Sequence, residues 1–129
     1  MRTKLFILLA ILFGATTWVN AQTSFSCSGF ETCILDDDLD PVDCAETKTP
    51  CLFVVNEAET VITHTTESDK TIFYVTKREV KETMITYTVK SDDGDDFFFM
   101  FMLEGEEILL YFEDDDEDYL VTFTVKAVF

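Results

Sequence analysis

The strongest constraint on the fold is a series of short β-type segments that begins at Cys51. Val, Ile, Thr, Phe and Tyr dominate these segments, and short polar stretches separate them, which is typical of antiparallel strands joined by turns. The predicted strands are 51–56, 60–66, 71–77, 83–90, 96–104, 107–113 and 119–128. In most of 83–90 and 119–128, apolar residues alternate with Thr and Lys, which we expect to face water. The pattern predicts an all-β fold, an antiparallel sandwich or meander of about seven strands.

Residues 1–21 are typical of a secretory signal peptide. Arg2 and Lys4 precede an apolar stretch, and Ala21 is a suitable cleavage position. The apolar stretch is shorter than the roughly 20 residues that a membrane-spanning helix needs, so an uncleaved anchor is the weaker alternative, and no later segment is long enough to span. We therefore expect a secreted, extracellular protein. It would form one domain from a cysteine-rich acidic segment, 22–51, and an antiparallel β domain, 52–129.

Four cysteines lie close together at the start of that domain: Cys27, Cys33, Cys44 and Cys51. In a secreted chain, an even number of clustered cysteines predicts disulfides, here two, and three pairings are possible. Their intervals do not match the paired Cys-x-x-Cys pattern of zinc sites. The aspartates and prolines around them oppose regular pairing, so we expect an irregular segment that the disulfides stabilise.

The segment predicted as a strand at 96–104 is apolar on both faces. One face carries large side chains that suit the core, and the other carries Phe98, Met100 and Met102. Leaving them exposed would forgo about 1.5–3 kcal/mol for each. We expect the second face to be covered by the cysteine-rich segment or an opposing sheet, by a second copy of the chain, or by a small apolar ligand or cofactor.

Acidic residues outnumber basic ones 26 to 9, which gives a net charge of −17. Such a surface repels phosphates, so nucleic acid is not an expected partner. Acids concentrate where strands reverse, where they keep an apolar sheet soluble and can also share a divalent cation such as calcium. The clusters at 92–96 and 113–118 flank a two-strand hairpin, so they should lie at one end of the fold. The candidate calcium ligands are Asp92, Asp93, Asp95, Asp96, Asp114, Asp115, Asp116 and Asp118.

The sequence lacks the residue patterns of common catalytic sites. His64 is the only histidine, and it falls in a predicted strand among threonines, where we expect a surface or cross-strand position. There is no phosphate-binding glycine loop and no His-Glu-x-x-His pattern, and oxidised cysteines offer no thiol nucleophile. We therefore expect a protein that is not an enzyme.

One part of the chain carries a family resemblance. Its motifs are Cys27-x5-Cys33, Asp40-Pro41-x-x-Cys44 and Cys51-Leu52-Phe53-Val54-Val55. This segment, Cys27 to Val55, resembles the cysteine-rich start of DOMON-type domains, the extracellular β-sandwiches of reeler and ferric-reductase-like proteins. The resemblance implies a domain that binds a sugar, or haem through a Met and a His. The family's glycine-rich central strand with its following methionine is not evident here, so no ligand residue is carried over.

These observations favour a secreted, acidic, non-catalytic β protein of the extracellular matrix or of a mineral surface. Its aspartate-rich edge would bind calcium, another divalent cation or a cationic surface. One alternative is a ligand-binding module that holds a lipophilic molecule or haem against the two-sided apolar hairpin. Another is a secreted factor that captures a basic protein by electrostatic attraction.

Overall fold

The computed structural model describes residues 22–104 and 106–129, and the predicted signal peptide lies outside them. The described residues form nine strands: β1 (Thr23–Leu35), β2 (Pro41–Thr47), β3 (Cys51–Val55), β4 (Val61–Thr65), β5 (Lys70–Val80), β6 (Met84–Ser91), β7 (Asp96–Met102), β8 (Glu107–Asp114) and β9 (Glu117–Val128). The seven strands predicted after Cys51 are present within a few residues of their expected bounds. Within the described ranges, no helix has the length and apolarity needed to cross a bilayer.

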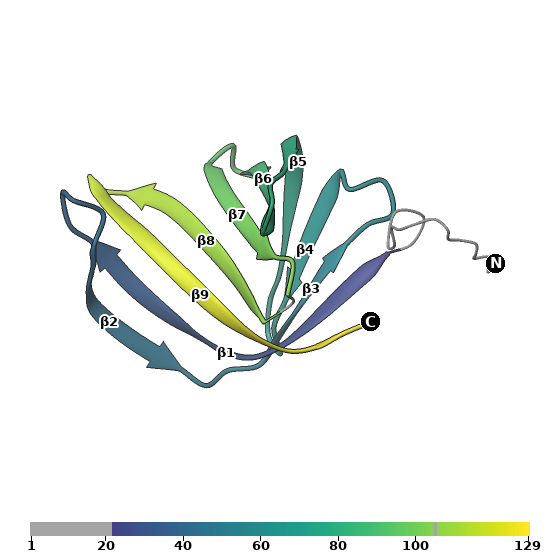
Figure 1. The fold of residues 1–129 in the computed structure, drawn as a ribbon, viewed down its shortest axis with the longest axis horizontal. Coiled ribbons are helices and arrows are strands. Elements are labelled where there is room, and N and C mark those ends of the chain that lie inside the picture. Colours follow the sequence, from purple (N-terminus) through teal and green to yellow (C-terminus); the bar gives the residue numbers. More distant parts are fainter. Residues whose placement is uncertain (1–21, 105) are drawn as a thin grey trace.

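The strands form one antiparallel sheet that closes on itself. Strands β3 to β9 pair in chain order, and β1 pairs with both β3 and β9. Eight strands therefore make a closed up-and-down barrel, to which β2 is added. Figure 1 shows β1 and β9 side by side along the molecule, with β2 outside β1. The all-β class is confirmed, but the prediction of a sandwich is wrong, because a single ladder closes instead of two sheets stacking.

Strands β1 and β2 were not predicted from the sequence. The first half of β1 pairs with β3 and the second half pairs with β2, while β9 occupies the opposite edge. Strands β2 and β3 are therefore two stretches of one edge, interrupted at 48–50. The expectation of an irregular segment at 22–51 is therefore wrong, because most of these residues lie in β1 and β2. Pro41 is compatible with a strand because it is the first residue of β2, an added strand with no partner beyond it in the strand order.

Gly29 allows the connection between β2 and β3 to pass close to β1. A Cβ atom at this position would lie 2.7 Å from the carbonyl oxygen of Thr47. The β1–β9 register shifts between Cys27 and Gly29, which is a bulge in β1. Glycine at the bulge therefore allows β1 to pair with both β3 and β2 along the same edge.

The barrel interior is filled mainly by aromatic side chains. The ring centroid of Phe53 lies 4.8 Å from that of Phe123, and both Phe99 and Phe101 also meet the Phe53 ring edge-on. The core consists of Phe25, Cys27, Cys51, Phe53, Val55, Ile62, Phe73, Ile85, Tyr87, Val89, Phe99, Phe101, Ile108, Leu110, Val121 and Phe123. Burial of each large apolar side chain contributes about 1.5–3 kcal/mol, so this cluster is the main source of stability.

Thr86 departs from the predicted alternation. It lies on the outward face of β6, yet only 3% of its surface is exposed, so the expectation that it faces water is wrong. Its hydroxyl donates a hydrogen bond to the carbonyl oxygen of Glu79 at 3.3 Å, and Met100 is its register partner on β7. Met100 covers the threonine, and the hydrogen bond to Glu79 compensates its hydroxyl for the loss of contact with water.

One of the two predicted disulfides is present. Cys33 and Cys44 are bonded, and they join β1 to β2. Cys27 and Cys51 are buried free thiols in this structure. The added strand is therefore held to the barrel both by its ladder with β1 and by a covalent link.

Candidate functional site: the acidic end of the barrel

The meander collects acidic residues at one end of the barrel. In an up-and-down topology every second connection lies at the same end, and here these are the regions 36–40, 66–69, 92–96 and 113–118. They hold four, two, four and six acidic residues, which is sixteen of the 26 in the chain. We call these four regions the acidic end. Figure 1 shows the β1–β2 and β8–β9 connections together at the left, as the pairing of Leu35 with Asp118 requires.

A pocket of about 380 Å³ opens between β7 and β8 at the acidic end. The ladder between the two strands ends at Phe98 and Tyr111, although both strands continue beyond these residues. The strands therefore diverge and leave an opening. Its lining combines four acidic residues with two aromatic ones: Asp95, Asp96, Glu113, Asp114, Phe97 and Phe112. The prediction that the 92–96 and 113–118 clusters lie at one end thus agrees with the arrangement of the strands.

Aromatic rings extend from the core to this pocket. The ring centroids of Phe97 and Phe112 are 5.4 Å apart, and Phe73, in the core, lies 5.2 Å from Phe97. On the other side, Phe112 stacks on Tyr119 at 5.3 Å. The pocket therefore combines the Phe97 and Phe112 rings, which we call its aromatic floor, with four acidic residues, one of which, Asp96, is ion-paired with Lys90. Aromatic rings close to acidic residues suit an organic cation.

Tyrosine hydroxyls lie among the carboxylates of the acidic end. The hydrogen bond to Asp92 raises the pKa of Tyr74, and the hydrogen bond to Glu117, at 3.0 Å, raises the pKa of Tyr119. Burial is the first cause that raises the pKa of Tyr111. These hydroxyls therefore stay protonated at neutral pH and donate to acidic neighbours.

The eight predicted calcium ligands lie at the acidic end but do not form a closed cage. Among the described residues, three carboxylates approach within 4.8 Å of one another only at Asp36, Asp38 and Asp40. Asp96 instead forms an ion pair with Lys90 at 2.7 Å. The alternating Asp36-x-Asp38-x-Asp40 spacing is the signal that could have identified this other group from the sequence.

Turn geometry accounts for the Asp36 group. One carboxylate oxygen of Asp36 accepts the backbone N–H groups of Asp38 and Asp40, each at 2.9 Å. This is the usual way in which an aspartate stabilises a turn. The three carboxylates are therefore held together by the chain itself, and all three residues are exposed to solvent.

The predicted apolar face lies on the outside of β7. Phe98, Met100 and Met102 are half-buried there, beside the outward residues Leu109 and Tyr111 of β8. Strand β7 makes its main contacts with β6 and β8. The expected covering by the cysteine-rich segment or by an opposing sheet is therefore wrong, and these side chains are partly covered by one another.

His64 is half-buried and lies in a cross-strand position, one of the two that we expected, and not fully at the surface. It is the register partner of Phe53, and the two ring centroids are 4.6 Å apart. A second aromatic ring, Phe123, lies 5.7 Å away. The imidazole Nε2 is buried and has no hydrogen-bond partner among the described residues. Threonine neighbours suggested exposure because the inward face of a short strand is hard to recognise from alternation alone.

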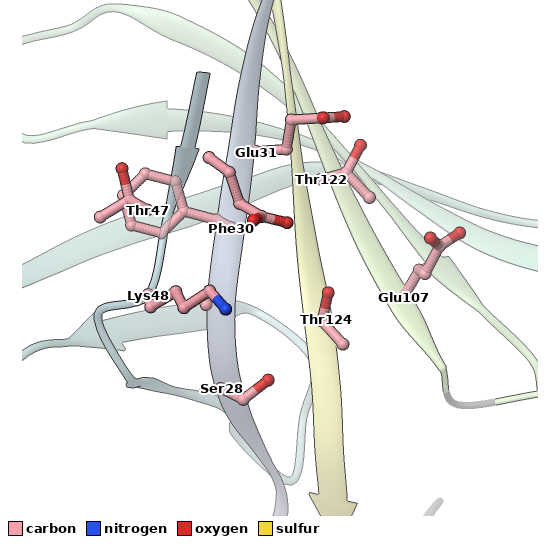
Figure 2. Close-up of a pocket in the computed structure, with 10 residues that line it drawn as sticks. Ser28, Phe30, Glu31, Thr47, Lys48, Glu107, Thr122 and Thr124 are labelled. Atoms are coloured by element: carbon pink, nitrogen blue, oxygen red, sulfur yellow. The ribbon is translucent and has the colours of Figure 1, made fainter. Parts of the chain in front are cut away.

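A second pocket of about 470 Å³ lies on the outside of the barrel, against β1 and β9. Figure 2 shows the side chain of Lys48 pointing across β1, with Thr124 and Thr122 on the neighbouring strand. Glu31 and Glu107 also line this pocket, so its walls are polar and mixed in charge. One aromatic residue, Phe30, lines it, whereas two line the pocket at the acidic end.

An ion-paired cluster lies toward the opposite end of the barrel. Glu59, in the β3–β4 connection, accepts hydrogen bonds from the Tyr87 hydroxyl and from Arg78 Nε, both at 2.7 Å. Burial and the carboxylate raise the pKa of Tyr87. Glu59 has a φ of 56°, which is unusual for a residue other than glycine. The cluster therefore holds a connection in a conformation that it would not adopt freely.

No protein-family model matches this chain, and no curated protein is significantly similar to it. The resemblance of Cys27 to Val55 to DOMON-type domains thus rests on the cysteine motifs themselves.

Proposed function

We propose that this protein is a secreted, non-catalytic binding protein whose acidic end captures the lysine and arginine side chains of a basic protein. The observation that carries the proposal is the pocket between β7 and β8, with carboxylates around the Phe97–Phe112 floor. A lysine or arginine side chain has a charged head for the carboxylates and an apolar stem for the rings. A calcium ion takes only oxygen ligands and would gain nothing from the rings.

The charge around the pocket supports the same role. Sixteen acidic residues surround one end, and only Lys70 and Lys90 border the four acidic connections. A concentrated negative field attracts a cationic protein over a distance and raises its rate of association, and this attraction weakens as salt is added. The acidic end would therefore select partners by charge and the pocket would hold individual side chains.

A calcium-bearing mineral or matrix surface is the second candidate. It is favoured by the three carboxylates of Asp36, Asp38 and Asp40, which lie within 4.8 Å of one another. Binding of a lipophilic molecule or haem at the apolar hairpin has less support. The face predicted for it, Phe98, Met100 and Met102, lies on the outside of the barrel and lines neither of the two pockets described above.

The first candidate is tested by measuring the affinity of the secreted chain for poly-L-lysine and poly-L-arginine at several salt concentrations. Asp95→Asn combined with Asp114→Asn removes two charges at the pocket, and Glu57→Gln combined with Glu104→Gln removes two at the opposite end. We expect about a tenfold weaker affinity for the pocket variant and little change for its control, because rim charges away from a contact contribute weakly. Equal losses in both variants would contradict a specific site.

A further variant tests the aromatic floor. Phe112→Leu keeps the charge and most of the apolar volume but removes the ring face. We expect a loss of about two- to fivefold in affinity, because a cation over an exposed ring gains roughly 0.5–1 kcal/mol. The second candidate predicts instead that the chain is retained on hydroxyapatite and that Asp38→Asn reduces this retention. Retention that Asp38→Asn abolishes, without binding to either polycation, would favour the mineral surface.

A further inference from the structure

Two unbonded thiols face each other where β1 meets β3. Cys27 and Cys51 are register partners on these antiparallel strands, with 1% and 7% of their surfaces exposed. Opposite residues of antiparallel strands have Cα atoms about 4.5–5.5 Å apart. This lies inside the range of about 4.4–6.8 Å that a disulfide bridges. The two strands are thus already positioned for a bond between the two sulfur atoms.

An imidazole lies on the same inner face. His64 is the register partner of Phe53, which is two residues from Cys51 on β3, so the inner faces of β3 and β4 place His64 beside this thiol. Its buried Nε2 has no hydrogen-bond partner among the described residues. The hydrogen bond between the two thiols raises the pKa of Cys27 and lowers that of Cys51, and His64 lowers the pKa of Cys51 further. These directions, together with the position of His64 on the neighbouring strand, favour Cys51 as the attacking thiolate.

We propose that Cys27 and Cys51 are a redox pair that closes to a second disulfide across the β1–β3 seam, with His64 as its positioning residue. The oxidant is a small disulfide such as oxidised glutathione. Cys51 thiolate attacks one sulfur of the oxidant, forms a mixed disulfide and releases one glutathione thiolate. Cys27 then loses its proton to solvent or to the imidazole, attacks the Cys51 sulfur and releases the second glutathione thiolate. The two thiols lose two electrons and two protons, and the oxidant gains the two electrons.

The first disulfide supports this assignment. Cys33 lies on the same strand as Cys27 and is already bonded to Cys44. An environment that oxidises this pair supplies an oxidant of the required class to the other pair. The new bond would join residues 24 positions apart, against 11 for Cys33–Cys44, so the two bridges would be nested. It would secure a seam at which only five register pairs connect β1 to β3.

The proposal is tested on the secreted full chain, equilibrated in glutathione buffers from reducing to oxidising. Samples are quenched with acid, alkylated in denaturant and analysed by intact mass and peptide mapping. We expect an oxidised product without alkylated cysteines, lighter than the reduced chain by about four hydrogen atoms, with Cys27–Cys51 and Cys33–Cys44 peptides. A folded product in which Cys27 and Cys51 are alkylated under all conditions, or are paired with other cysteines, would overturn the proposal.

Two sets of variants refine the test. In the Cys33→Ala/Cys44→Ala background only the proposed pair remains, and oxidation should raise the melting temperature by about 10–20 °C, the effect of closing a loop of this size. If the protein with these two substitutions does not fold, the peptide map of the unmodified chain still shows whether Cys27 and Cys51 are bonded to each other. His64→Phe should slow disulfide formation about tenfold at pH 7 and shift its pH profile upward, while the outward-facing Thr63→Ala should not. Identical profiles for both variants would remove His64 from the assignment.

Discussion

Replacing Tyr87 with Phe should lower the free energy of unfolding by about 1.5–3 kcal/mol, the range for hydrogen bonds to charged groups. The Tyr87 side chain is fully buried, and its hydroxyl donates to Glu59 Oε1 at 2.7 Å. The same oxygen accepts a hydrogen bond from Arg78. Because the ring remains in Tyr87→Phe, no large cavity forms. The decrease in the free energy of unfolding therefore measures the contribution of the hydrogen bond.

The same substitution should change how stability depends on pH. Burial, and then Glu59, raise the pKa of Tyr87 above its ordinary value. The folded state therefore holds the phenolic proton more tightly than the unfolded chain does. This contribution is fully present below the unfolded pKa of about 10 and is lost as the pH rises above it. We expect the unmodified protein to lose stability above about pH 10 more steeply than Tyr87→Phe does.

Urea unfolding at pH 7 and at about pH 10.5 measures both effects, and a double-mutant cycle with Glu59→Gln isolates the pairwise term. The cycle should give a coupling energy of about 1 kcal/mol or more. Tyr74→Phe is the matched control, since Tyr74 is 46% exposed and its loss should stay within about 0.5 kcal/mol. A Tyr87→Phe loss no larger than this control, or a coupling energy near zero, would refute the role of this cluster.

Three further substitutions probe the packing and the backbone, each measured by urea or thermal unfolding. Phe53→Ala should cost about 3–5 kcal/mol, because four aromatic rings meet the Phe53 ring inside the barrel. Gly29→Ala should cost about 1–3 kcal/mol, since its Cβ would lie 2.7 Å from a backbone oxygen. Gly94→Ala should cost about 1 kcal/mol from its φ of 86° alone, as no atom lies within 4 Å of the added Cβ. A Gly29→Ala cost no larger than that of Gly94→Ala would show that the β2–β3 connection moves easily.

The strands after Cys51 were predictable because local patterns determine them. Alternation such as that of Ile85, Tyr87 and Val89, interrupted by polar turns, depends on burial of one face, which any antiparallel arrangement provides. The same logic failed for β1 and β2. Their acidic and small residues carry little strand preference, and their pairing with β3 and β9 is a tertiary effect. The choice between sandwich and barrel depended on that pairing, because β1 supplies the strand that closes the sheet.

The inward site residues were less predictable than the strands. His64 looked like a surface residue because its sequence neighbours are threonines, and only the β3–β4 register places it opposite Phe53. The pairing of Cys33 with Cys44 likewise follows from the ladder between β1 and β2, which the spacing of four cysteines does not specify. The role of such residues depends on how the strands pair, and strand pairing could not be predicted from this single sequence.

The acidic end is different, because counting connections is enough to derive it once a meander is accepted. Connections in a meander alternate between two ends, so acids that favour alternate connections must gather at one end. Counted with the two strand residues on each side, the connections 66–69, 92–95 and 115–116 at that end hold twelve acids, whereas those at 56–60, 81–83 and 103–106 hold seven. If acids served only to keep the sheet soluble, either end would suit equally well. The excess of acids at one end of the barrel is therefore an observation on which the proposed binding role rests.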